Sequence, residues 1–378
     1  MSITRRHLLG RLGVGAAAAA AGPALAESAF ASVLVPPTLA ASDLIRLHRN
    51  ENAYGASPRA MLALMDALSS TVQRFPDVES DALRRTLASL HGVEFDRIVI
   101  GCGSTDVLRM AANAMLVPGT SVVTALPTFD VLTRFAEQRG AAVTAVALTT
   151  QHAHDLDGML AAVDASTRLV YICNPNNPTG TLTRRQDLER FVRTLRSDVF
   201  IVIDEAYHHY VDAKAEYASF IDRPIDDPRI IVTRSFSKLF ALAGARVGYA
   251  VVAPTTARLL AASALPDAVS ALAARAAALS LDDSEHGQWT AQRNASERQE
   301  FLSQANRRML RTIDSHTNFV MLDTARPSAE IVQHLRANRI LVGGPYPRYE
   351  SYIRVSLGTS DEIREFWRVV DLVGPPRT

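Results

Sequence analysis

Short apolar runs alternate with amphipathic stretches along the chain from about residue 79 onward. The runs are rich in β-branched residues and predict strands, because such side chains suit a pleated, buried surface. These strands cover residues 97–100, 121–125, 142–148, 169–173, 200–203, 230–233 and 247–252. Stretches with helical spacing separate them and predict helices over 79–91, 104–116 and 129–139. Strands that alternate with helices indicate an α/β fold, with a mostly parallel sheet sandwiched by helices.

The pattern changes near residue 254. An alanine-rich stretch over 254–280 predicts a helix, and a strongly charged stretch over 284–311 predicts another. Three later apolar runs predict strands of a smaller α+β domain, over 319–322, 340–342 and 352–356. We therefore expect a leader over 1–26, an N-terminal arm over 27–70, a large domain over 71–266 and a small domain over 267–378.

The first 26 residues have the composition of a targeting segment. Arg5, Arg6 and Arg11 precede an uncharged stretch that is too short to span a membrane comfortably and ends in a small-x-small cleavage pattern, Ala24-Leu25-Ala26. The paired arginines resemble a twin-arginine signal. We expect the twin-arginine export machinery to recognise the segment and the protein to be periplasmic or otherwise exported. The alternative is a cytoplasmic protein with an alanine-rich extension.

The amino-acid composition excludes some classes of binding partner. The 378 residues are 48% hydrophobic and 21% charged, with a net charge of +1, which is ordinary for a globular protein. A near-neutral balance argues against nucleic acid as a partner, because phosphate backbones select basic surfaces. No further segment approaches the length of a membrane span. Cys102 and Cys173 are the two cysteines, so no disulfide framework is predicted. The predicted site includes no metal.

Polar loops follow four of the predicted strands. The carboxyl ends of parallel strands meet at one edge of a sheet, and the loops there build the sites of α/β proteins. We therefore expect the side chains of these loops to form a site. The loops are Gly101–Thr105, Asn174–Gly180, Asp204–Tyr207 and Ser235–Lys238.

Lysine usage singles out one amine. The chain has 40 basic residues, of which Lys214 and Lys238 are the two lysines. Acidic residues flank Lys214, and this charged context predicts a surface position. Lys238, in contrast, follows an apolar strand. Arginine stays protonated in proteins, whereas a lysine can lose its proton and attack a carbonyl group. Lys238 is therefore the candidate nucleophile.

Two further features of these loops suit a charged cofactor. Asp204 ends an apolar strand, and a carboxylate buried there needs a partner such as a protonated pyridine nitrogen. A metal ligand or a helix N-cap are the alternatives for this residue. Hydroxyl groups, a guanidinium and a helix start are suited to bind a phosphate. They belong to Ser235, Ser237, Arg246 and the stretch Gly103-Ser104-Thr105.

The sequence resembles the class I/II aminotransferases of pyridoxal-phosphate (PLP) fold type I, in the histidinol-phosphate aminotransferase-like branch. The resemblance covers about residues 45–378, and its motifs occur in the order typical of the family. They are Asn50–Gly55, Arg74–Asp77, Gly103–Asp106, Asn176–Gly180, Asp204–Tyr207, Ser235–Lys238, Ala243–Gly248 and Arg354–Thr359. The resemblance implies a large PLP-binding domain, a small C-terminal domain and a homodimer.

The resemblance also assigns roles to catalytic residues. Lys238 would hold PLP covalently and then act as the general base on the substrate α-hydrogen. Asp204 would pair with the pyridinium nitrogen, and Asn177 and Tyr207 would bond the ring 3′ oxygen. Phe129 would stack on the ring, where the family often has tyrosine. The catalytic set is thus Lys238, Asp204 and Tyr207.

The remaining roles concern anionic groups. The cofactor phosphate would be bound by Gly103, Ser104, Thr105, Ser235, Ser237 and Arg246. Arg354 would bind the substrate α-carboxylate in bidentate fashion. The segment from Glu51 to Tyr54 would line the substrate mouth. Substrates would be an L-amino acid and a 2-oxo acid, converted in turn by a ping-pong mechanism.

Departures from the family pattern bear on the substrate. In the family, the motif at Arg74–Asp77 supplies a tyrosine to the cofactor phosphate across the dimer, whereas this sequence has Phe75 at that position and would lack the hydrogen bond. Gly343 and Gly344 lie where histidinol-phosphate enzymes carry an arginine for the substrate phosphate, and Arg348 is a candidate to compensate. We therefore expect an amino donor other than histidinol phosphate, with a carboxylate. The alternatives are histidinol-phosphate aminotransferase itself, a PLP-dependent lyase or decarboxylase on the same scaffold, and a non-catalytic PLP-binding module.

Overall fold

The computed structural model describes residues 44–213 and 215–373. From Arg46 onward they form one compact unit. The predicted export signal over 1–26 and the surface lysine Lys214 lie outside the described residues. No helix within 44–213 and 215–373 is long and apolar enough to cross a bilayer.

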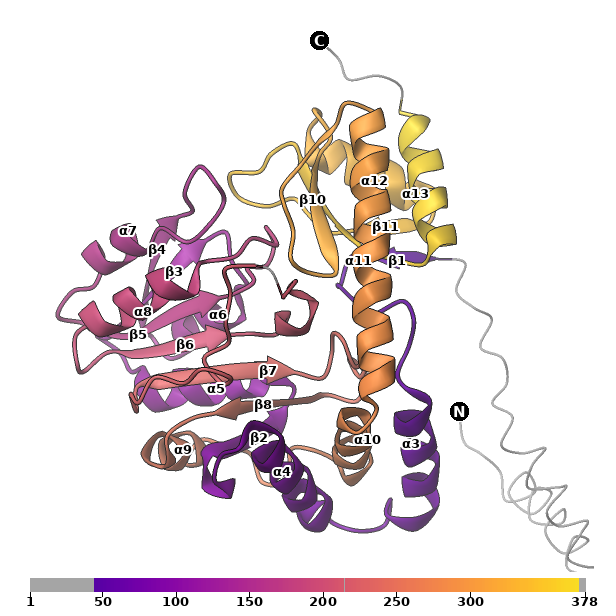
Figure 1. The fold of residues 1–378 in the computed structure, drawn as a ribbon. Helices are drawn as coiled ribbons and strands as arrows, with labels where there is room; N and C mark the ends of the chain where they lie inside the picture. The colour runs from indigo at the N-terminus through magenta and orange to yellow at the C-terminus, as the bar shows by residue number, and fades with distance from the viewer. Residues whose placement is uncertain (1–43, 214, 374–378) are drawn as a thin grey trace, which may run out of the picture. The chain divides into compact units, whose positions relative to one another are not determined.

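A seven-stranded sheet forms the centre of this unit (Figure 1). Its order is β2-β8-β7-β6-β5-β3-β4, and the strands from β7 to β4 run parallel to their neighbours. β8 is antiparallel to both β7 and β2. The bounds are β2 (Ile98–Cys102), β3 (Ser121–Leu126), β4 (Ala142–Ala147), β5 (Thr167–Cys173), β6 (Phe200–Asp204), β7 (Ile230–Ser235) and β8 (Val247–Val251). The prediction of a mostly parallel α/β sheet is confirmed.

Both faces of the sheet are buried, because successive side chains of a strand point to opposite faces. In β5, Val170 and Ile172 belong to one core cluster, and Leu169 and Tyr171 belong to another. The first cluster includes α4 (Asp77–His91), α7 (Leu156–Ala161), α8 (Arg185–Thr194) and α10 (Ala271–Leu281). The second includes α5 (Ser104–Met115), α6 (Val131–Gln138) and α9 (Pro254–Ala261). Helices on both faces explain why the strands are almost wholly apolar.

The C-terminal part contains a second, antiparallel sheet in the order β12-β10-β9. The long helix α11 (Ser284–Arg307) extends from α10 to this sheet, as Figure 1 shows. A separate pair of strands joins β1 (Ile45–Leu47) to β11 (Ile340–Val342). The other elements are β9 (Arg311–Thr312), β10 (Phe319–Asp323), α12 (Ser328–Ala337), β12 (Tyr352–Ser356) and α13 (Ser360–Asp371). The domain boundaries that the sequence predicts, at 70/71 and 266/267, are not tested by these elements and remain predictions.

Two helical regions differ from the sequence prediction. The stretch over 254–280 forms two helices, α9 and α10, because Pro266 follows the first and Asp267 has a positive φ of 52°. Helix α3 (Pro58–Ser70) lies within the predicted arm, and the Ser57 side chain caps its first turn. Its alanines Ala60, Ala63 and Ala67 are buried, and the helix contacts α10.

Candidate functional site

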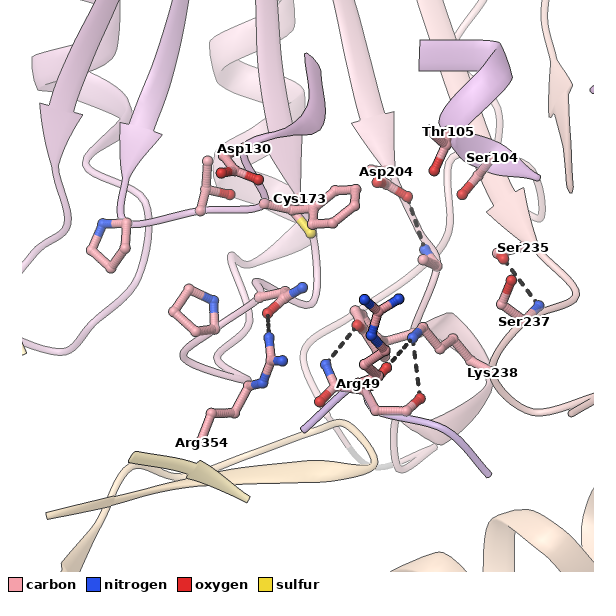
Figure 2. Close-up of a pocket in the computed structure, with 18 of the residues that line it drawn as sticks. Arg49, Ser104, Thr105, Asp130, Cys173, Asp204, Ser235, Ser237, Lys238 and Arg354 are labelled. Atoms are coloured by element: carbon pink, nitrogen blue, oxygen red, sulfur yellow. Dashed lines mark hydrogen bonds between the residues drawn. The ribbon is translucent and has the colours of Figure 1, made fainter. Parts of the chain in front are cut away.

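A cavity of about 990 Å³ lies at the carboxyl ends of the central strands (Figure 2). Residues from the loops after β2, β3, β5, β6 and β7 line it, together with the segment 48–51 and β12. Most of the predicted site residues therefore meet in one place. The predicted residues in its wall are Glu51, Ser104, Thr105, Phe129, Asn177, Asp204, Tyr207, Ser235, Ser237, Lys238, Arg246 and Arg354.

The Lys238 amine is held by backbone carbonyl groups. Its Nζ donates to the carbonyl oxygen of Arg49 at 3.0 Å and to that of Asn50 at 3.1 Å. Burial, aided by the nearby charge of Arg354, lowers the pKa of Lys238 from its usual 10.5 to about 7. A substantial fraction of this amine is therefore uncharged near neutral pH, which a nucleophile or general base requires.

Asp204 presents a buried carboxylate to the same cavity. It is the last residue of β6, its side chain accepts from the Tyr171 hydroxyl at 3.0 Å and from the Ala206 N–H at 3.2 Å, and burial raises its pKa. Among the described residues no cationic side chain pairs with it. A bound cation at this carboxylate would offset the cost of its burial.

Tyr207 and Asn177 each keep a donor for a ligand oxygen. The Tyr207 hydroxyl accepts from Asn50 Nδ2 at 2.9 Å, which leaves its own proton to donate. Asn177 accepts a hydrogen bond from Arg354 through Oδ1, so its amide NH₂ group is left to donate within the described chain. The Arg354 guanidinium also donates to the His48 carbonyl oxygen at 2.7 Å, and its buried Nε has no partner in the described chain.

An anion-binding cradle is formed where α5 begins. A Cβ on Gly103 would lie 2.3 Å from an Arg246 guanidinium nitrogen, and one on Gly248 would lie 2.1 Å from the Ser104 backbone nitrogen. These two glycines therefore let the guanidinium and β8 approach the start of the helix, where free N–H groups attract anions. Ser235 and Ser237 lie beside them, and the Ser237 N–H donates to Ser235 Oγ at 3.0 Å.

Three of the predicted residues have positions or partners that do not suit the roles expected of them. Tyr54 lies outside the cavity, where its hydroxyl donates to Glu297 at 2.9 Å and its ring contacts Trp289 edge-on. Glu51 lines the cavity, but its carboxylate is paired with Arg46 at 2.8 Å. Arg348 is exposed and does not line the cavity, so it cannot replace a substrate-binding arginine there without a change of conformation.

The cavity also contains residues that sequence reasoning missed. His48 and Arg49 precede the motif Asn50–Gly55 and line the wall, and their proximity to that motif was the available signal. Tyr346 lies in the loop after β11. A Cβ on Gly343 would lie 2.6 Å from the Tyr346 hydroxyl and 3.2 Å from Arg354 Nε. The space that an arginine at position 343 would need is therefore taken by other side chains.

These groups fit a phosphorylated pyridine aldehyde. The cradle at α5 suits its phosphate, the buried carboxylate of Asp204 suits a protonated ring nitrogen, and the Lys238 amine suits its aldehyde. Tyr207 and Asn177 hold donors for a ring oxygen, and Phe129 offers an aromatic face in the wall.

Comparison with known proteins covers almost the whole described chain. Residues 42–370 match the family described as aminotransferase class I and II. The histidinol-phosphate aminotransferase of Methylobacillus flagellatus is 36% identical over 337 residues, which are 89% of this chain and 90% of that protein. That of Moorella thermoacetica is 34% identical over 333 residues, 88% and 86% of the two chains. A crystal structure of the Sinorhizobium meliloti histidinol-phosphate aminotransferase in complex with pyridoxal-5′-phosphate has 28% identity and a TM-score of 0.82, and covers 88% and 92%.

Proposed function

The chain belongs to the class I and II aminotransferases, and on that premise we propose that it moves an amino group between an amino donor and a 2-oxo acid with bound pyridoxal phosphate. The observation that carries the proposal is the cavity in which the Lys238 amine, the Asp204 carboxylate and the anion cradle of Arg246 and α5 face one another.

Each side chain has a defined task in this reaction. The cofactor, when bound, supplies an electron sink that makes the α-hydrogen of an attached amine acidic. With the cofactor bound, Asp204 would pair with the ring nitrogen, and Tyr207 and Asn177 would donate hydrogen bonds to the ring oxygen. With the cofactor bound, the Lys238 amine would accept and release the α-proton of the substrate, and its pKa of about 7 suits it to this general base role. Arg354 binds an anionic group of the substrate and so fixes its orientation.

Histidinol phosphate is the first amino donor to be considered. The curated relatives named above carry that activity in their names, and the alignments cover at least 86% of their length. The expectation of a different donor rests on the missing arginine at Gly343 and Gly344. It has less support than histidinol phosphate, which the names of the relatives favour. A carboxylate-bearing amino acid therefore becomes the second candidate.

A half-reaction screen tests the function. The holoenzyme is mixed with one donor at a time, histidinol phosphate or an L-amino acid, and the visible absorbance of the bound cofactor is followed. We expect histidinol phosphate to abolish this absorbance and a 2-oxo acid to restore it. Failure of every donor would refute the proposal. Release of CO₂ or ammonia, with the absorbance restored in the absence of an oxo acid, would instead support the lyase alternative.

A homodimer is part of the proposal, and its support is an exposed apolar stripe on α3 and the following turn. Met61, Met65, Leu68 and Val72 recur with helical spacing on the face opposite the buried alanines, and all are exposed; Phe75 is 78% exposed. Contiguous apolar surface of this kind is typical of protein interfaces.

Charge placed on this stripe is expected to separate the subunits. A Met65→Asp/Leu68→Asp variant would bury two carboxylates in the interface, so light scattering should report a monomer where the wild type is a dimer. Met309→Asp is the matched control, because Met309 is 92% exposed and lies elsewhere. A dimeric double variant, or a monomeric wild type, would contradict the assignment.

Export by the twin-arginine route is also proposed, on the support of residues 1–26 alone. Cell fractionation tests it. The wild type is expected in the exported fraction and an Arg5→Lys/Arg6→Lys variant in the cytoplasm, whereas the same distribution of both would favour the cytoplasmic alternative.

A further inference from the structure

The backbone of Arg49 is fixed between the two main polar groups of the cavity. The preceding carbonyl, of His48, accepts from Arg354, and the Arg49 carbonyl accepts from the Lys238 amine. The next residue is anchored as well, since the Asn50 N–H donates to Ser356 Oγ at 2.8 Å. The Arg49 side chain therefore starts between Lys238 and Arg354, and Figure 2 draws it between these two residues.

Within 44–213 and 215–373, no carboxylate is paired with the Arg49 guanidinium. It is exposed, lines the cavity, and has no hydrogen bond or ion pair among the residues that the structure describes. Each described carboxylate of the same wall already has a partner. Glu51 pairs with Arg46, Asp130 pairs with Arg134, and Asp204 is bonded by Tyr171.

The other cations of the wall have separate tasks. Arg246 lies at the phosphate cradle, and Arg354 is aligned by Asn177 and His48. After the cofactor phosphate and one substrate anion are bound, the positive charge of Arg49 is still uncompensated. A substrate with a second anionic group would balance it.

The turn at Gly343, beside Arg354, leaves little room for another cation. Tyr346 and Arg354 fill the space beside Gly343, so a longer side chain at that position would collide with them. From these observations we infer that Arg49 is the specificity-determining residue that binds the second anionic group, a carboxylate or a phosphate, of whichever substrate carries two, the amino donor or the 2-oxo acid, in addition to the group bound by Arg354. The inference rests on the proposed function, because it assigns the substrate class of the same cavity.

Binding of unreactive acids to the holoenzyme separates this inference from turnover. Glutarate, 3-phosphonopropionate and pentanoate share one carboxylate and differ at the far end, which carries a second carboxylate, a phosphonate or a methyl group. Isothermal titration calorimetry should show that the wild type binds at least one dianion roughly 10- to 100-fold more tightly than pentanoate, the range expected for one charged hydrogen-bonded pair. Whichever dianion binds more tightly identifies the carboxylate or the phosphate as the preferred group.

Arg49→Gln is expected to remove this preference while leaving pentanoate affinity within about twofold. Arg134→Gln is the matched control, since Arg134 lines the same cavity but is already paired with Asp130. An unchanged preference in Arg49→Gln, its loss in Arg134→Gln instead, or no preference in the wild type would each overturn the inference. Because these acids cannot transfer an amino group, a negative donor screen would refute the proposed function without deciding this test.

Discussion

Lys238→Ala is expected to lower the turnover number for amino transfer at least about 10³-fold, because the variant loses both the nucleophile and the general base. Among the described residues that line the cavity, Lys238 is the one lysine, so no other amine is available there. Rates are measured by mixing holoenzyme with the donor found in the half-reaction screen. Lys238→Arg is the matched control: it keeps a positive charge but cannot deprotonate, so it should be equally inactive. Full turnover in either variant would refute the assigned role.

The same substitution has a second, pH-dependent signature in the cofactor-free protein. The Lys238 amine has a pKa of about 7 when folded and about 10.5 when unfolded. Between these pH values the unfolded chain binds more protons than the folded one, so this residue makes stability rise with pH across that window. Urea denaturation at pH 7 and pH 9 should show a smaller rise for Lys238→Ala than for the wild type. Equal rises would mean that the amine is not desolvated.

Most of the cavity was predictable because its residues follow the strand pattern. A polar loop after each apolar strand places Asp204, Asn177 and Ser235 at one sheet edge once the strands run parallel. Lys238 was recognisable from composition, since lysine is rare in this chain. These signals are local in sequence, and the parallel topology brings them together without further information.

The residues that were missed or placed differently depend on contacts between distant segments. Arg49 enters the wall because Asn50 bonds Ser356, which is 306 positions away. Tyr54 lies outside the wall because its hydroxyl bonds Glu297 and its ring contacts Trp289, both on α11. The space beside Gly343 is filled by the side chain of Tyr346. Tyr346 lies in a loop, so the spacing of a helix or strand does not predict where its side chain points. Sequence patterns predict which face a side chain takes on its own element, but not which distant segment meets it there.

A buried ion pair behind the cavity connects the strands that carry Asp204 and Ser235. Glu205 and Arg234 are the neighbours of those residues, and alternation directs them to the opposite face of the sheet. Their side chains are 1% and 4% exposed, with a nitrogen–oxygen distance of 3.1 Å. Ser219 Oγ and the Phe220 N–H donate to the same carboxylate at 2.6 and 2.8 Å. The pair therefore holds the ends of β6 and β7 in register behind the site.

Glu205→Gln is expected to lower the free energy of unfolding by about 3–5 kcal/mol, because it leaves the Arg234 guanidinium buried without its main counter-charge. Asp198→Asn is the matched control: Asp198 pairs with Arg196 at 2.6 Å, but the two side chains are 52% and 40% exposed, so its loss should cost no more than about 1 kcal/mol. Urea denaturation of the cofactor-free variants measures both. Glu205→Gln should also weaken cofactor binding, since Asp204 and Ser235 lose their common support, whereas Asp198→Asn should not. Equal stability and equal cofactor affinity in the two variants would show that the ion pair supports neither the sheet nor the site.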